Sequence, residues 1–225
     1  MERARSRPRS LAAADAHQKR VTPFFKGLLL AYALVWIALA IRPKYPSDWL
    51  LENLLVFALV GALVATWRRF RFSDFSYFLI ALFLSLHAYG AHYTYSEAEL
   101  GYRMEELFGW SRNHYDRIVH FSFGLLLTYP VREIVQRTLR GRVFWRWLLP
   151  LMIVLSMSAG YEIVESWVAR AVSPELGTAY LGTQGDQWDS QKDMALAGAG
   201  AILATLATEA CRRLTGKEAR ELFPW

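Results

Sequence analysis

The chain has 225 residues, of which 54% are hydrophobic and 15% aromatic, and its formal net charge is +6. This composition is too apolar for an ordinary soluble domain, and the excess lies in blocks close to the roughly 20 residues that a helix needs to cross a bilayer. The positive charge gathers at the ends of these blocks and forms no nucleic-acid-binding motif, so we expect a membrane protein without a nucleic-acid partner.

Six hydrophobic blocks predict six transmembrane helices, in chain order at 24–41, 49–67, 75–93, 115–136, 147–169 and 191–211. We therefore expect an all-α membrane protein. A basic, disordered tail would cover 1–23, a six-helix transmembrane domain 24–211 and a second tail 212–225. The triplet Ala38-Leu39-Ala40 also fits a signal-peptidase site, and cleavage there would leave five spans.

The distribution of Lys and Arg predicts the orientation. Seven lie before or at the start of the first span, three follow the second, four follow the fourth and four follow the sixth, so that 18 of the 26 basic residues share one side. By the positive-inside rule, this asymmetry with an even number of spans places both termini in the cytoplasm. We expect a multi-pass protein of the cell inner (cytoplasmic) membrane, in contact with its lipids.

Two longer loops lie on the other side. In the first, about 94–113, segment 97–108 predicts a short amphipathic helix. In the second, about 170–190, Gly177, Gly182 and Gly185 predict turns. The run of small residues over 195–201 predicts that the sixth span approaches its neighbours closely.

Polar residues of the spans collect at the extracytoplasmic end, whereas the cytoplasmic ends carry almost only Lys and Arg. Alternate spans run in opposite directions, so these positions alternate in sequence yet meet at one face. Ionisable groups at membrane depth cost several kcal/mol each and usually mark function. The residues concerned are Glu52, Asn53, His87, His92, His114, Asp116, His120, Glu162, Glu165, Asp186, Asp189 and Asp193.

Carboxylate and imidazole groups suit a divalent metal ion of a kind that the pattern does not identify. The strict Glu-x-x-His and His-Glu-x-x-His motifs do not occur. The expected metal ligands are His87, His92, His120, Glu162, Asp189 and Asp193. The expected acid–base residues are Asp116, His120, Glu162 and Glu165.

Helical spacing refines this expectation. His87 and His92 are five residues apart and diverge by about 140°, so we expect one of them, the deeper His87, to point inward. One alternative to a bound cation is that some of these acids retain protons, because like charges so close together raise their pKa values. Another is a polar plug in which nearby basic residues neutralise the acids. Arg117 and Lys192 adjoin Asp116 and Asp193 in sequence and so point about 100° away from them.

Four stretches, 87–97, 109–121, 159–167 and 181–194, resemble the YjdF-type bacterial inner-membrane proteins, a domain family of unknown function, over roughly residues 25–210. The resemblance implies the topology and the motif residues but no reaction. More distantly, the chain resembles the VanZ-like membrane proteins. That resemblance maps their acids and histidine onto Asp116, His120, Glu162 or Glu165, and Asp189 or Asp193.

Three functions fit these observations. The first is a membrane-embedded enzyme that acts on a lipid or cell-envelope precursor. The second is a proton- or cation-coupled transporter, although no inverted repeat is evident. The third is an envelope assembly factor that docks a partner through the two longer loops. Bound metal would favour the first, flux that depends on a pH gradient the second, and insensitivity to acid and His substitution the third.

Overall fold

The protein is described by a computed structural model that covers residues 21–139, 143–217 and 221. Its six long helices are α2 (Pro23–Ala40), α3 (Pro46–Thr66), α4 (Asp74–Tyr93), α6 (Tyr115–Thr138), α7 (Val143–Ala171) and α9 (Asp189–Thr215). All six contain segments long and apolar enough to cross a membrane. The predicted all-α, six-span class is thereby confirmed. Residues 1–20 of the first predicted tail, and 218–220 and 222–225 of the second, lie outside the described residues.

Local sequence explains where several helices begin and end. Thr22 and Ser73 cap α2 and α4, because each side chain accepts a hydrogen bond from the backbone N–H three residues later. Pro23 then occupies the first turn of α2, where a missing N–H costs nothing. Gly216 ends α9 in the left-handed conformation that glycine adopts without steric penalty.

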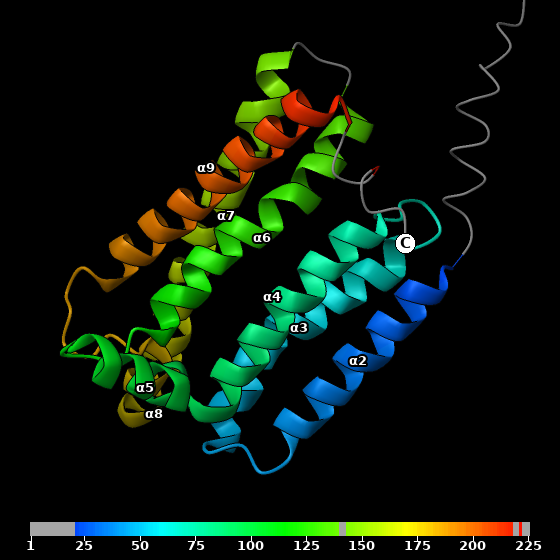
Figure 1. Cartoon of the computed structure of the whole chain (residues 1–225). Coiled ribbons are helices and arrows are strands. Elements are labelled where there is room, and N and C mark those ends of the chain that lie inside the picture. Colours follow the sequence, from blue (N-terminus) through cyan, green and yellow to red (C-terminus); the bar gives the residue numbers. More distant parts are fainter. Residues whose placement is uncertain (1–20, 140–142, 218–220, 222–225) are drawn as a thin grey trace, which may run out of the picture.

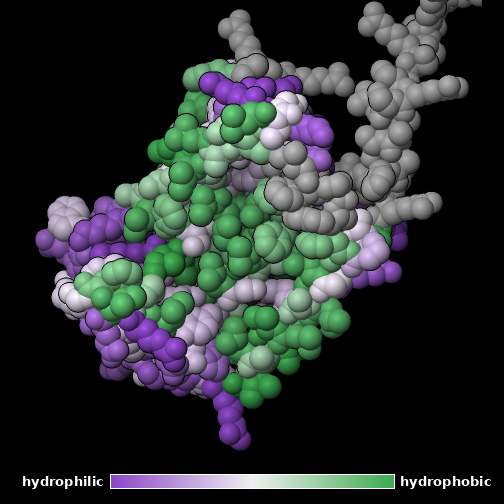
Figure 2. Space-filling view, viewed as in Figure 1, coloured by the Kyte–Doolittle hydropathy of each residue, from purple (hydrophilic) through white to green (hydrophobic). Residues whose placement is uncertain are grey.

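The long helices run alternately up and down (Figure 1). The short helices α5 (Glu99–Phe108) and α8 (Pro174–Leu181), with the single turn η1 (Tyr95–Glu97), gather at one end, which we call the α5–α8 end. The start of α2 and the end of α9 lie at the opposite end. Figure 2 shows hydrophobic side chains over the middle of one face and hydrophilic ones toward both ends, as a bilayer requires.

The two loop predictions have different outcomes. The amphipathic helix predicted over 97–108 is confirmed as α5. Gly182 and Gly185 have positive φ angles and form turns as expected. The turn predicted at Gly177 is wrong, since this residue lies inside α8. Its missing side chain serves packing instead, because a Cβ there would lie 2.4 Å from the carbonyl oxygen of Ala169 on α7.

The closest helix pair is α6 and α9. A Cβ built on Gly124 of α6 would lie 1.8 Å from the carbonyl oxygen of Ala197, and one on Gly200 of α9 would lie 2.2 Å from that of Phe121. The two backbones therefore touch where glycines face them, the small-residue packing used between membrane helices. The close approach predicted for the sixth span is thus present.

The outer helix α2 has no buried residue, and many leucines of the long helices are exposed. Helix α2 nevertheless contacts the rest of the bundle through a hydrogen bond, in which the indole N–H of its Trp36 donates to the side-chain oxygen of Asn53 on α3 at 2.9 Å. Apolar side chains exposed over a helix of membrane-spanning length are what a lipid environment favours.

The orientation in the membrane stays a prediction. Reporter fusions after residues 70, 141 and 215 are expected to report the cytoplasm, because the basic residues gather at these positions. Fusions near residues 100 and 178, in α5 and α8, are expected to report the outside. A fusion at 178 that reports the cytoplasm would contradict the six-span orientation.

Candidate functional site

Four polar side chains from three helices meet toward the α5–α8 end, and we call them the His120 cluster: Asp116 and His120 of α6, Glu162 of α7 and Asp193 of α9. One potential ligand atom from each of Asp116, His120 and Asp193 lies within 4.8 Å of the others. The Nε2 atom of His120 is 3.5 Å from Oδ1 of Asp116 and 3.6 Å from Oε1 of Glu162. The sequence pattern proposed all four residues as site residues, and the fold brings them together.

Burial makes this cluster chemically unusual. Glu162 is 8% exposed and Asp193 2% exposed. Oε1 of Glu162 and Oδ1 of Asp193 are buried without a hydrogen-bond partner. A buried carboxylate oxygen without a partner costs free energy unless a cation or a proton satisfies it. Each of these two oxygens therefore carries a desolvation cost that no hydrogen bond within the described residues offsets.

The helix packing explains why the cluster forms here. Asp116 and His120 are one turn apart and share a face of α6. The glycine contacts at Gly124 and Gly200 draw α9 against this face, which lets the short side chain of Asp193 reach it. Glu162 completes the group from α7, where its Oε1 lies 3.6 Å from Nε2 of His120.

A second acidic group lies beside the cluster but is already paired. The Nη1 atom of Arg112 is 2.9 Å from Oδ1 of Asp189, and Nη2 of Arg117 is 3.1 Å from the same oxygen. Arg117 and Lys192 also bind Asp186, at 2.6 and 2.5 Å. In this second group the acids are neutralised by basic residues, as the polar-plug alternative expects. These contacts place Asp189, an expected metal ligand, in an arginine pair instead of the His120 cluster.

The charge environment of Asp186 supports this reading. Hydrogen bonds from Lys192, the backbone N–H of Trp188 and Arg117 lower the pKa of Asp186 to about 2. Arg117 and Lys192 thus turn toward Asp186 and away from their sequence neighbours Asp116 and Asp193, as the 100° step around a helix predicts.

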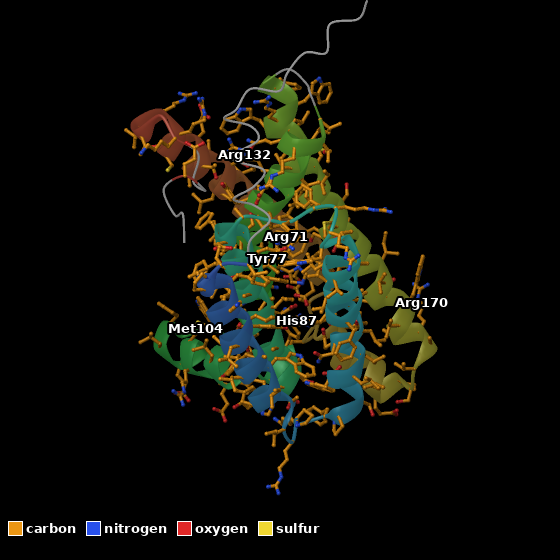
Figure 3. All side chains as sticks on the ribbon, turned by 90° about the vertical axis from the view of Figure 1, so that its right-hand side faces the viewer. Arg71, Tyr77, His87, Met104, Arg132 and Arg170 are labelled. Atoms are coloured by element: carbon orange, nitrogen blue, oxygen red, sulfur yellow. The ribbon has the colours of Figure 1, made fainter. Side chains whose placement is uncertain are left out.

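His87 is buried inside the bundle (Figure 3), as expected for the deeper of the two histidines. Its Nε2 lies 3.1 Å from the carbonyl oxygen of Glu52 and its Nδ1 lies 2.5 Å from the hydroxyl of Tyr95. A carbonyl only accepts, so Nε2 carries the proton and Nδ1 accepts from the tyrosine. With both ring nitrogens in use, His87 joins α3 and η1 to α4.

His92 lies elsewhere. Its Nδ1 is 2.7 Å from the carbonyl oxygen of Leu39 at the end of α2, and its own carbonyl accepts from the backbone N–H of Lys44 at 2.8 Å. These contacts fasten the connection between α2 and α3. The fold therefore does not bring His92, an expected metal ligand, to the His120 cluster.

Glu165 belongs to a neighbouring polar group that sequence reasoning recognised only in part. Tyr161 donates a hydrogen bond to Oε2 of Glu52 at 3.2 Å, and Glu165 lies one turn beyond Tyr161 on α7. Glu52 was noted as polar without a role, and Tyr161 and Tyr95 were missed. Tyrosine is uncharged and common in this aromatic-rich chain, so a search for ionisable residues in the spans does not single it out. Both tyrosines nevertheless lie within the stretches that carry the family resemblance.

One buried acid lies at the opposite end of the bundle. Glu133 accepts hydrogen bonds from the backbone N–H of Ser73 at 2.9 Å and from the hydroxyls of Ser73 and Ser76, and it pairs with Arg137. It therefore satisfies the first turn of α4 and an arginine. Because the sequence at this end of the spans is dominated by Lys and Arg, it does not indicate this structural role of Glu133.

A cavity of about 430 Å³ opens beside the cluster, between α3, α4, α6 and α7. Its polar part is formed by His87, Tyr95, Asp116, His120, Ser158 and Tyr161. Most of its remaining lining is apolar: Leu55, Val56, Ala58, Leu59, Phe83, Leu84, Val119, Phe123, Leu127, Met157 and Val164. The cavity thus joins a hydrocarbon-like space to two members of the His120 cluster.

Comparison with known proteins agrees with this architecture. The family described as predicted membrane protein (DUF2238) matches residues 24–213. The inner membrane protein YjdF of Escherichia coli (strain K12) is 38% identical over 191 residues, which cover 83% of this chain and 90% of that protein. No solved structure matches significantly, and the resemblance to VanZ-like proteins gains no support. With its six spans, the protein is a multi-pass inner-membrane protein, and the chain belongs to the DUF2238 family of membrane proteins.

Proposed function

We propose that the His120 cluster binds a divalent metal ion and that the protein is a membrane-embedded enzyme acting on a lipid or lipid-linked cell-envelope precursor. The observation that carries this proposal is the group of Asp116, His120 and Asp193. Their potential ligand atoms lie within 4.8 Å of one another, and Oδ1 of Asp193 is buried without a hydrogen-bond partner. Unlike Asp189, these carboxylates form no ion pair with arginine among the described residues.

The donor set is suited to metal chemistry. One imidazole and carboxylate oxygens are ligands for Zn, Mn or Fe, and three protein ligands leave a coordination position for water or substrate. A metal bound by Asp116, His120 and Asp193 would supply a Lewis acid. Glu162, close to His120, would act as the general base. Glu165, one turn beyond the cavity residue Tyr161 on α7, would supply a further carboxylate near the site.

The transport alternative finds less support. A proton relay requires acids along the width of the membrane. Glu133, the buried acid near the other end of α6, lies 13 residues from His120, about 20 Å along the helix. Its oxygens are bound by Ser73, Ser76 and Arg137, which suits a structural role better than proton transfer.

The proposal predicts a metal-dependent melting temperature. Addition of the correct ion among Zn, Mn, Mg and Ca to metal-depleted protein is expected to stabilise the wild type by about 2.7 kcal/mol at 100 times the dissociation constant. Asp193→Asn should abolish most of this gain. Asp186→Asn is the matched control, because Asp186 is bound by Arg117 and Lys192, and it should keep the gain. Equal gains in both variants would contradict the assignment.

A further inference from the structure

The wall of the cavity is incomplete on one side. Helix α3 packs on α4 and α8, and α7 packs on α6, α8 and α9, so the cavity fills the space between α3 and α7. Toward the α5–α8 end this space is bridged by the hydrogen bond from Tyr161 to Glu52. Along the rest of the cavity, the two helices face each other across it.

The residues on the two edges show that this side opens outward. Leu55 and Met157 line the cavity yet are 42% and 47% exposed. Ala58 on α3 and Gly160 on α7 are also exposed. The deep wall, in contrast, is formed by the buried residues Val56, Leu84 and Leu127 of three helices. Since both edges lie within spans, the neighbour outside this opening is the bilayer.

The length and polarity of the cavity suit a lipid. Leu127 lies 11 residues beyond Asp116, about 16 Å along α6, so the space extends from the charged cluster deep into the hydrocarbon region. Its volume falls within the range of about 300–1,000 Å³ of small-molecule sites. An apolar slot that ends at acids and a histidine matches a molecule with a hydrocarbon chain and a polar head.

We propose that one hydrocarbon chain of a membrane lipid enters this cavity sideways from the bilayer, through the opening between α3 and α7, and places the polar part of the lipid at Asp116 and His120. This inference rests on the proposed function for the chemistry at the polar end, and it adds the substrate class and the route of entry. Gly160 is a determinant of this route, because a Cβ built there meets no atom within 4 Å and the opening stays free.

The test uses the full-length protein in vesicles of phosphatidylethanolamine and phosphatidylglycerol, with a photoreactive diazirine in one acyl chain of a fraction of the phosphatidylethanolamine. In the wild type, crosslinks are expected on the deep wall, at Val56, Leu84 or Leu127. Gly160→Phe should lower this deep labelling at least about tenfold, which corresponds to about 1.4 kcal/mol. Leu55→Trp, on the other edge of the opening, should act in the same direction.

Gly61→Phe is the matched control, since a Cβ at Gly61 on α3 also meets open space and the residue does not line the cavity. It should leave the deep labelling unchanged. The proposal is overturned if the lipid probe labels the deep wall of Gly160→Phe as strongly as that of the wild type. It is also overturned if the probe labels the wild type only at outward residues such as Leu54 and Phe57.

The same samples separate this inference from the proposed function. Asp193→Asn should lose the metal-induced stabilisation but keep the labelling of the deep wall. Deep labelling in a wild type whose melting temperature no metal raises would support lipid entry and contradict the metal site. A metal-induced gain without deep labelling would contradict lipid entry alone.

Discussion

Gly124→Ala is expected to destabilise the protein by about 3 kcal/mol, the upper part of the usual range for overpacking. The added Cβ would lie 1.8 Å from the carbonyl oxygen of Ala197, and a backbone atom cannot move aside as a flexible side chain can. Helices α6 and α9 would have to separate. A loss of this size lowers the melting temperature of a chain this long by roughly 6–12 °C, which a thermal melt in detergent measures.

Gly61→Ala provides the control for this prediction. The new Cβ meets nothing within 4 Å, and alanine stiffens the unfolded chain, so this variant should be neutral or more stable by about 0.4–1 kcal/mol. Similar melting temperatures for Gly124→Ala and Gly61→Ala would show that α6 and α9 do not depend on their glycine contacts.

Asp193→Asn is expected to make the protein more stable than the wild type when divalent ions are absent, and less stable than the wild type when they are present. In a chelator, the wild type holds Asp116, Glu162 and Asp193 close together. The nearest ligand oxygens of Asp116 and Asp193 lie within 4.8 Å of each other, and two ionised carboxylates at about that separation repel by about 3 kcal/mol at an effective dielectric constant of 20. Removal of one charge should therefore raise the melting temperature above that of the wild type. With the ion at saturation, the wild type should be the more stable protein.

Melting curves of both proteins with chelator and with each metal would show this crossing. Glu162→Gln should behave similarly, because Glu162 is near the same histidine. If the wild type stays more stable in both conditions and no ion shifts either curve, the cluster charges are neutralised within the protein, and the polar-plug interpretation extends to these residues.

The spans and their shared polar end could be predicted because both follow from short-range rules. Twenty apolar residues suffice for a span, and alternation of direction then places acids such as Asp116 and Glu162 at one face. The fold agrees with this reasoning for the four members of the His120 cluster. Their positions within each span place these residues at the same end of the bundle, and helix packing then brings the faces that carry them together.

The partition of the acids could not be predicted in the same way. Asp189 and Asp193 are one turn apart on α9, yet Asp189 binds Arg112 and Arg117, whereas Asp193 faces His120. The difference depends on where the connection before α6 places Arg112. No periodicity in the sequence encodes that position.

The role of His87 was hidden for a related reason. Its depth in the span predicted a buried position, but both of its ring nitrogens are taken by Glu52 and Tyr95. One of those partners is a backbone carbonyl, which every residue has. Sequence therefore indicates which polar groups are buried, while only the fold shows which of them keep an atom available for a ligand.

Elemental analysis of the purified protein tests the central claim most directly. We expect close to one divalent metal ion per chain in the wild type and in Asp186→Asn, and a large loss of that metal in Asp193→Asn and His120→Ala. Wild-type protein that contains no metal, and takes up none of Zn, Mn, Fe, Mg or Ca on dialysis, would contradict the account.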